Sequence, residues 1–365
     1  MDALTKAIYD EVSRIINPVY LVGGSVRDIL MERSPKDYDF CTPLNPDQIE
    51  ELVKKAGRKP FITGKRFGTV GFKVMIDKVP YMVEVTTFRT ESYEEGNRKP
   101  TVEFVNDITH DLSRRDFTIN SMAWRNGKLI DPFNGQEDLR NGVLKAVGRA
   151  KTRFKEDPLR MLRAARFASQ LGFEVDLKTQ EDMTERAHSI LTVSKERWMA
   201  ELDKLLMSPN PSIGLDLLMD TRIMNFIIPE LAIQKNYNQN SKYHRFDLWT
   251  HTKLVVEKAP ATIECKWAAL LHDIAKPFVM TIKVEPKIYY HPVPNWREAT
   301  EEQKQEPAIK WTQHYIKHDF LGAEMVDKIA LYLKWSNDRH KQVRELVLNH
   351  LKDDCPIRQA DREAH

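Results

Sequence analysis

The stretch from Leu21 to Thr42, LVGGSVRDILMERSPKDYDFCT, decides which fold the chain is expected to adopt. Apolar residues lead into Gly23 and Gly24, which predicts a strand that ends in a tight turn before a helix. The alternating segment DYDFCT predicts a second strand. Asp37 and Asp39 stand two residues apart in it, so the pleat of the strand places both carboxylates on one face of the sheet.

This pair of carboxylates predicts a site for a divalent cation. Two adjacent carboxylates repel each other, which costs stability unless a cation neutralises them. Mg²⁺ suits the pair because it prefers oxygen ligands and completes its shell with substrate phosphates. The turn at Gly24 offers backbone N–H groups to a phosphate, and Arg27 adds charge-assisted hydrogen bonds. Together these parts predict nucleotidyl or phosphoryl transfer.

Each of these parts also has a simpler interpretation. A glycine pair often serves only a tight turn, and aspartates on a strand often face solvent. The fixed order of strand, glycine turn, helix and second strand favours the catalytic interpretation. Glu84, in YMVEVTTFR, either supplies a third carboxylate from a neighbouring strand or is a polar residue on the open face of the sheet.

Length and composition indicate a globular protein of two or three domains with 365 residues. Lys and Arg number 56 against 53 Asp and Glu, so net charge alone does not predict a nucleic-acid binder. Three widely separated cysteines favour a reducing, cytoplasmic setting over a disulfide framework. The acidic, amphipathic start differs from a signal peptide, and no apolar run approaches the roughly 20 residues that span a bilayer.

The distribution of strand and helix signals predicts an α+β protein with a mixed-sheet head and an all-α remainder. Strand signals concentrate in residues 1–140, whereas almost everything after about residue 150 is expected to be helical. A polar segment near 230–245 divides the helical part into a neck, 141–230, and a body, 231–365. Residues 90–104, TESYEEGNRKPTVEF, are polar and contain Gly and Pro, which predicts a long mobile loop.

Five blocks of sequence, in order, resemble the class II tRNA nucleotidyltransferases, a family that includes CCA-adding enzymes and bacterial poly(A) polymerases. The blocks are LVGGSVRDILMERSPKDYDFCT (21–42), RRDFTINSMA (114–123), DPFNGQEDLRNGVLKAVG (131–148), EDPLRMLRAARFASQLGF (156–173) and SKERWMAELDKLL (194–206). The resemblance covers roughly residues 18–230. It implies a polymerase-β-like nucleotidyltransferase head that adds CCA to tRNA 3′ ends from CTP and ATP, without a template, and releases pyrophosphate.

The resemblance also implies a role for individual residues. Asp37 and Asp39 would be the catalytic Mg²⁺ ligands. The implied nucleotide-binding residues are Gly24, Arg27, Arg115, Asp157, Arg160, Arg163 and Arg166. In this family the aspartate and arginine of E-D-x-x-R read the incoming base, and here these are Asp157 and Arg160.

The chemistry of that pair agrees with base reading. An aspartate accepts hydrogen bonds and an arginine donates them, which matches the amine and ring nitrogen that both C and A present. U and G place a carbonyl where the amine would be, so a buried pair would reject them. Residues 157, 160, 163 and 166 are three apart, which predicts neighbouring positions on one helix.

Simpler interpretations exist for the second and fourth blocks as well. Asp157 can cap a helix with Pro158 at its first position, while the arginines form an exposed basic face. In RRDFTIN, Arg114 and Asp116 either organise the site together with Asn120 or form a surface ion pair.

The C-terminal part resembles the HD superfamily of metal-dependent phosphohydrolases, in the segments DLWTHTKLV and AALLHDIAKP. The candidate metal ligands are His251, His272, Asp273, His318 and His350, and Asp353 and Asp354 are candidates for a final aspartate. Ala275 stands where the familiar pattern has glycine. The resemblance implies a second divalent metal, although an inactive RNA-binding body or a histidine-containing core is also consistent with these residues.

Several functions therefore remain open from the sequence. The leading one is CCA addition with tRNA, CTP and ATP as partners and no membrane association. A poly(A) polymerase or a CC-only or A-only adding enzyme is the nearest alternative. TESYEEGNRKP lies where CCA-adding enzymes carry a flexible loop thought to help the switch from C to A, which disfavours a CC-only enzyme. An HD phosphohydrolase with an RNA-recognising head, and a non-enzymatic RNA-binding protein, are alternatives from other classes.

Overall fold

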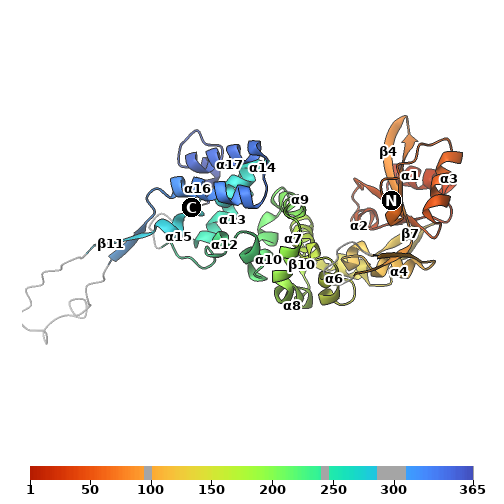
Figure 1. The fold of residues 1–365 in the computed structure, drawn as a ribbon, viewed down its shortest axis with the longest axis horizontal. Helices are drawn as coiled ribbons and strands as arrows, with labels where there is room; N and C mark the ends of the chain where they lie inside the picture. The colour runs from red at the N-terminus through yellow and green to blue at the C-terminus, as the bar shows by residue number, and fades with distance from the viewer. Residues whose placement is uncertain (94–100, 240–245, 286–309, 365) are drawn as a thin grey trace, which may run out of the picture. The chain divides into compact units, whose positions relative to one another are not determined.

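The computed structural model describes residues 1–93, 101–239, 246–285 and 310–364. These residues form two compact units, Met1–Val193 and Ser194–His365 (Figure 1). No helix among the described residues is both long and apolar enough to cross a membrane. The narrower domain limits near residues 140 and 230 stay a prediction.

A mixed six-stranded sheet, in the order β3-β4-β2-β1-β7-β8, forms the centre of the first unit. Strands β2 and β4 run parallel, and the other neighbours in the sheet are antiparallel. The predicted mixed-sheet head is therefore confirmed. The strands are β1 (Tyr20–Val22), β2 (Tyr38–Thr42), β3 (Thr69–Ile76), β4 (Val79–Thr87), β7 (Ala123–Arg125) and β8 (Lys128–Ile130).

Helices surround and extend this sheet within the first unit. The α-helices are α1 (Ala3–Ile15), α2 (Gly24–Leu30), α3 (Pro46–Lys55), α4 (Ile108–Ser113), α5 (Gly135–Arg140), α6 (Ala150–Glu156), α7 (Leu159–Leu171) and α8 (Leu177–Arg186). The 3₁₀ helices are η1 (Lys65–Phe67), η2 (Thr118–Asn120) and η3 (Ala187–Thr192).

Helices α1 and α3 pack against the sheet strand β3. Helix α3 begins with a reciprocal capping box between Asn45 and Gln48. Its buried residues Ile49 and Val53 contribute to the same core as Phe40 of β2. Because side chains alternate along a strand, Asp39 lies on the face opposite to Phe40, away from this core.

Two small pairs of strands correct the sequence-based assignment within the first unit. Residues 90–104 do not form one continuous loop, because β5 (Arg89–Ser92) and β6 (Thr101–Phe104) pair in an antiparallel hairpin. Residues 94–100, between these strands in the sequence, lie outside the described residues. Strand β9 (Val143–Leu144) pairs in parallel with β10 (Glu174–Val175), within the part predicted to be almost entirely helical.

The second unit is mainly helical, as predicted, and α13, α14, α16 and α17 pack around its core. The helices are α9 (Lys195–Leu206), α10 (Pro211–Asp220), α11 (Met224–Ile227), α12 (Pro229–Ala232), α13 (Leu248–Lys258), α14 (Ile263–Leu271), α15 (Lys276–Val279), α16 (His318–Tyr332), α17 (Asn337–Asn349) and α18 (Arg358–Glu363). An antiparallel hairpin of β11 (Thr281–Glu285) and β12 (Lys310–His314) is the exception to the all-α prediction. Of the predicted linker, residues 240–245 lie outside the described part.

Candidate functional site

The two predicted metal-binding aspartates lie at the start of β2. Asp39 pairs in register with Glu84 on the neighbouring parallel strand β4, so both side chains share the face of the sheet opposite to Phe40. Ser25, buried in α2, donates a hydrogen bond of 2.8 Å to the carbonyl oxygen of Asp37 and lies 3.4 Å from the backbone nitrogen of Asp39. The glycine turn and the aspartates are thus joined by one buried hydroxyl.

The charge around Asp39 suits a hard cation. Desolvation by the surrounding protein raises the pKa of Asp39, Glu84 and Asp37 raise it further, and Arg115 opposes them. The side chain nevertheless remains open to solvent. A carboxylate on an accessible face whose charge is disfavoured by neighbouring carboxylates fits the ligand preference of Mg²⁺.

The sequence indicated Gly23 only as part of a turn. In the structure this glycine also permits the close approach of Arg115. Gly23 has φ +70°, and a Cβ atom there would lie 2.9 Å from Nη1 of Arg115. The fully buried Asp111 holds Arg115 at 3.3 Å and accepts hydrogen bonds of 2.7 and 3.1 Å from Arg114. Burial lowers the pKa of Arg115, but Asp111 and other acidic groups outweigh this effect and raise it.

A second buried carboxylate, Asp116, joins three of the sequence blocks. Arg163 of α7 donates hydrogen bonds of 2.8 and 2.5 Å to its Oδ2. Asn120 donates to its Oδ1 over 3.2 Å and accepts a hydrogen bond of 2.9 Å from Arg27 of α2. The alternative of a surface ion pair for RRD is wrong, because Asp116 is buried with these partners.

Phe167, which was not among the predicted site residues, lies among three predicted nucleotide-binding arginines. The guanidinium carbons of Arg27, Arg163 and Arg166 lie 5.4, 5.4 and 3.9 Å from the centre of its ring. Such contacts orient cations against an aromatic face. Its position four residues after Arg163 on one helix was the available signal.

The E-D-x-x-R segment forms the junction between α6 and α7. Asp157 precedes α7, so the prediction that it shares a helix surface with the three arginines is wrong. Its Oδ1 accepts a hydrogen bond of 3.1 Å from the N–H of Leu159, but Pro158 rather than Asp157 is the N-cap of α7, so the expected cap position is also wrong.

Arg160 is buried, which excludes the exposed basic face as a description of this residue. Its guanidinium donates to Glu156 Oε2 at 2.6 Å and to the carbonyl oxygens of Arg153 and Arg114 at 3.2 and 2.9 Å. Glu156, the first letter of E-D-x-x-R, was not among the predicted site residues.

Glu91 connects the β5–β6 hairpin to this junction. Its Oε1 accepts hydrogen bonds of 2.8 Å from Arg89 and 2.9 Å from Arg114, and Tyr93 donates to Oε2 over 2.7 Å. Because the carbonyl of Arg114 in turn holds Arg160, the base of the hairpin is tied to the predicted base-reading arginine.

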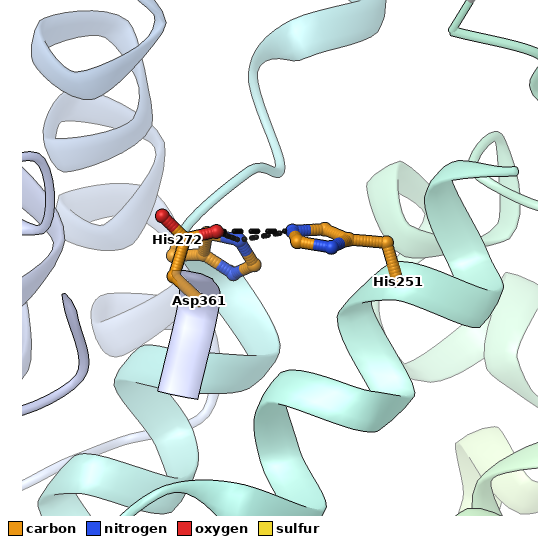
Figure 2. Close-up of side chains that lie close together, drawn as sticks. All are labelled: His251, His272 and Asp361. Carbon is orange, nitrogen blue, oxygen red and sulfur yellow. Dashed lines mark hydrogen bonds and ion pairs between the residues drawn. The ribbon is translucent and has the colours of Figure 1, made fainter. Parts of the chain in front are cut away.

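In the second unit, His251 of α13, His272 at the end of α14 and Asp361 of α18 converge (Figure 2). The Nε2 atoms of the two histidines are 3.1 Å apart, and Asp361 Oδ1 lies 3.2 Å from His251 Nε2. A second group, Asp273, His318 and His350, has the same Nε2–Nε2 distance between its histidines. All five predicted HD residues therefore come together.

Asp361 completes the first group of possible metal ligands. The prediction that Asp353 or Asp354 is the final aspartate is therefore wrong. Asp353 is exposed and pairs with Arg362, and Asp354 is also exposed. The sequence offered no periodic signal for Asp361, because α18 is a short, separate helix.

Protonation in this cluster is strongly perturbed. Burial lowers the pKa of His251, but hydrogen bonds to Asp273 and Asp361 outweigh it and raise the pKa to about 9. Burial and the neighbouring His272 lower the pKa of His350 to about 4. Burial raises the pKa of Asp273, but the facing cations hold it well below its usual range.

These two sites define a nucleotidyltransferase-like head and an HD-type helical unit, and comparison with known families agrees. Residues 19–145 match the "Poly A polymerase head domain", residues 172–234 the "Probable RNA and SrmB- binding site of polymerase A", and residues 243–362 the "HD domain".

Curated relatives show to which family the chain belongs. A CCA-adding enzyme of Geobacillus sp. (strain WCH70) is 42% identical over 231 residues, covering 63% of this chain and 55% of the relative. The CCA-adding enzyme of Staphylococcus epidermidis is 34% identical over 295 residues, covering 75% and 72%. The chain belongs to the CCA-adding enzyme family, although it spans little more than half the length of several matched relatives.

Solved structures agree with the fold. The Bacillus stearothermophilus CCA-adding enzyme in complex with CTP superposes with a TM-score of 0.60 at 24% identity, covering 100% of this chain and 82% of that one. A tRNA nucleotidyltransferase complexed with a primer tRNA and an incoming ATP analog gives a TM-score of 0.52 at 27% identity, covering 73% and 74%. The family and the HD domain imply dependence on divalent metal ions.

We predict that Asp116→Asn destabilises the first unit in a pH-dependent way. Burial raises the pKa of Asp116, but Arg163 and the hydrogen bonds lower it to about 2. Since the folded pKa is below the ordinary value, the stabilisation is complete above about pH 4 and disappears as the pH falls through about 2.

Urea unfolding at pH 7 and pH 3 checks this expectation. At pH 7 the free energy of unfolding of the variant should be about 1–2 kcal/mol below that of the wild type. This value is reduced from the full effect of the pKa shift because Arg163 is partly exposed, and the difference should shrink at pH 3. The control is Asp77→Asn in the exposed β3–β4 turn, which should match wild type. An equal loss at both pH values would contradict the assigned ion pair.

Proposed function

We propose that the chain is a template-independent tRNA nucleotidyltransferase that adds C, C and A to 3′ ends from CTP and ATP and releases pyrophosphate. The observation that carries the proposal is the position of Asp39, which pairs in register with Glu84 and whose charge is influenced by Asp37, Glu84 and Arg115, beside the glycine turn. The membership of the chain in the CCA-adding family supports the same activity. We further propose that it works in the cytoplasm, in keeping with its three unpaired cysteines.

Asp37 and Asp39 would hold Mg²⁺, with Glu84 beside them. Bound there, the ion would supply charge neutralisation at the triphosphate and activation of the attacking 3′-hydroxyl. Arg115, fixed by Asp111, and Arg27, fixed by Asn120, are the cations placed to bind the triphosphate. Because buried partners hold both guanidiniums in place, they would need little rearrangement to stabilise charge on the departing pyrophosphate.

Asp157 and Arg160 would read the base. A guanidinium has five N–H donors, and three hydrogen bonds from Arg160 go to Glu156 and two carbonyl oxygens within the described residues. The remaining donors can meet the ring nitrogen of C or A, while Asp157 accepts from the exocyclic amine. U and G have a carbonyl where C and A have this amine, so one edge serves both correct substrates and disfavours the others.

Incubation with labelled nucleotides tests the proposal. Wild-type protein with tRNA lacking its 3′ end and Mg²⁺ should incorporate C and A but not U or G. Asp39→Asn should lower the rate at least about a hundredfold, because the nucleotide metal site loses a ligand charge. Asp77→Asn, a matched exposed carboxylate, should retain the rate. Long A tails would instead support a poly(A) polymerase, and incorporation of C or A alone a partial adding enzyme.

A second candidate function, hydrolysis of phosphoesters by the HD unit, is favoured by the convergence of His251, His272, Asp273 and Asp361. Histidine and carboxylate ligands together suit a divalent metal that activates water. The residues of this chain would hold the ion and orient the phosphoester.

Hydrolysis of bis(p-nitrophenyl) phosphate in the presence of Mn²⁺ checks this function. His272→Ala should reduce the rate at least about tenfold, whereas His340→Ala, which removes a partner of Asp327 at the edge of α17, should not. A wild-type protein inactive with Mn²⁺, Co²⁺ and Ni²⁺ alike would reject hydrolysis and leave the nucleotidyltransfer proposal unaffected.

A further inference from the structure

Four residues form one row across the sheet of the first unit, on the face that carries Asp39. Asp39 of β2 pairs in register with Glu84 of β4, and Glu84 pairs with Gly71 of the edge strand β3. Phe61 continues the row beyond β3, because it forms an antiparallel bridge with Gly71 through backbone hydrogen bonds of 2.7 and 2.9 Å. Residues paired in register share a face, so the side chain of Phe61 lies on the same face as Asp39.

The side chains of Phe61 and Met82 lie together above Gly71. A Cβ atom at Gly71 would lie 3.6 Å from Cβ of Phe61 and 3.9 Å from Sδ of Met82. Both side chains are nevertheless exposed, at 40% and 47%. One exposed apolar side chain is ordinary, but these two form a joint surface directly beside Glu84 in the row. We call it the Phe61–Met82 surface.

Lys73 adds a positive charge to the same face. It pairs in register with Met82, so the two side chains are neighbours on this side of the sheet. Lys73 is exposed, and within the part of the chain that the structure describes no carboxylate forms an ion pair with it. Proteins hold single-stranded nucleic acids with aromatic rings that stack bases and cations that follow the phosphates. The Phe61–Met82 surface and Lys73 offer both.

The geometry of the reaction determines which substrate lies on this side of Asp39. In nucleotidyl transfer the attacking hydroxyl and the leaving pyrophosphate lie roughly in line, on opposite sides of the phosphorus atom. Gly24 and Arg115, which are proposed to bind the triphosphate, lie beside the end of β1. Strand β1 neighbours β2 on the side away from β4. The primer is therefore expected to approach Asp39 over β4 and β3.

We propose that Phe61 and Met82 stack the penultimate base of the RNA primer and that Lys73 binds a phosphate beside it. Three strand spacings, roughly 14 Å, separate Asp39 from Phe61 in the row. A primer whose 3′-hydroxyl lies at Asp39 covers this distance with the nucleotide before its last one. The three side chains are positioning residues for the primer. This assignment rests on the proposed nucleotidyl transfer and adds to it the residues that hold the second substrate.

A protein partner is the other occupant that an exposed apolar surface can have. The Phe61–Met82 surface continues through Glu84 to Asp39 in one row, so a protein that covered it would also restrict access to the predicted metal ligands. A primer strand, in contrast, must reach Asp39 for the reaction to occur. The continuity of the row therefore favours RNA.

Equilibrium binding to a tRNA that ends in C and C, measured by fluorescence anisotropy, tests the stacking contact. Phe61→Leu keeps an apolar side chain without a ring and should weaken binding about tenfold, whereas Phe61→Trp should retain it. An abasic nucleotide at the penultimate position should weaken binding to the wild type by a similar factor, with little further effect on Phe61→Leu. Unchanged binding by Phe61→Leu, or losses that simply multiply, would overturn the proposal.

Salt dependence tests the phosphate contact. Lys73→Gln should weaken binding and reduce the slope of log affinity against log salt concentration by about 0.7, because one contact to a single-stranded phosphate is lost. Val79→Ala is the matched control, since Val79 is an apolar side chain of β4 that is 48% exposed on the opposite face. It should retain both affinity and slope. A wild-type slope in Lys73→Gln would overturn the assignment of Lys73.

Steady-state kinetics separates this proposal from the proposed function. Phe61→Leu should raise KM for the tRNA about tenfold and leave kcat and KM for ATP within about twofold, because the ring contacts only the primer. A wild-type protein that binds the tRNA but adds no nucleotide would refute the proposed function alone, since the binding comparison still decides the stacking contact. Wild-type self-association that Phe61→Leu abolishes, with unchanged tRNA binding, would assign the surface to a second copy of the chain instead.

Discussion

Two buried carboxylates, Asp111 and Asp116, fix the arginines on which the proposed nucleotide site of the first unit depends. A carboxylate that is removed from water destabilises a fold by several kcal/mol unless cations and hydrogen bonds compensate for it. Asp111 is compensated by Arg114 and Arg115, and Asp116 by Arg163. Movement of Arg163 would leave the buried charge of Asp116 without its arginine, and movement of Arg114 or Arg115 would leave Asp111 with only one of its two arginines, so these ion pairs hold the cations in place.

The same constraint extends to Arg160, the arginine predicted to read the base. Arg114 joins Asp111 to Glu91 of the hairpin, and its carbonyl oxygen holds Arg160. Elements far apart in the sequence thereby share one set of hydrogen bonds around the predicted nucleotide. In the second unit the buried charges are arranged differently. There the imidazoles and the carboxylate of Asp273 form a set of electron-pair donors that suits cations.

The sequence predicted the elements that depend on local patterns. Alternation and the glycine turn placed β1, α2 and β2. The hairpin of β5 and β6 was missed because its residues are polar and its pairing with Arg114 is a tertiary effect. Asp361 was missed for a related reason, since only the fold brings the short helix α18 to His251.

Side-chain partners were the least predictable part of the site. Spacing placed Asp157 on the helix of the arginines, whereas it lies at the end of α6 and accepts a hydrogen bond from the N–H of Leu159. Arg160 was predicted from a motif, but its partners Glu156 and the Arg114 carbonyl depend on how α6, α7 and the second block meet. Helical periodicity cannot supply such contacts, because they join separate elements.

The central claim is that this chain itself builds a defined 3′ end without a template. Sequencing the 3′ ends of a tRNA lacking CCA, after incubation with all four nucleotides at equal concentration and Mg²⁺, tests it most directly. The account predicts that extension stops after C, C and A, in that order. Unextended ends, or tails of variable length and composition, would contradict it.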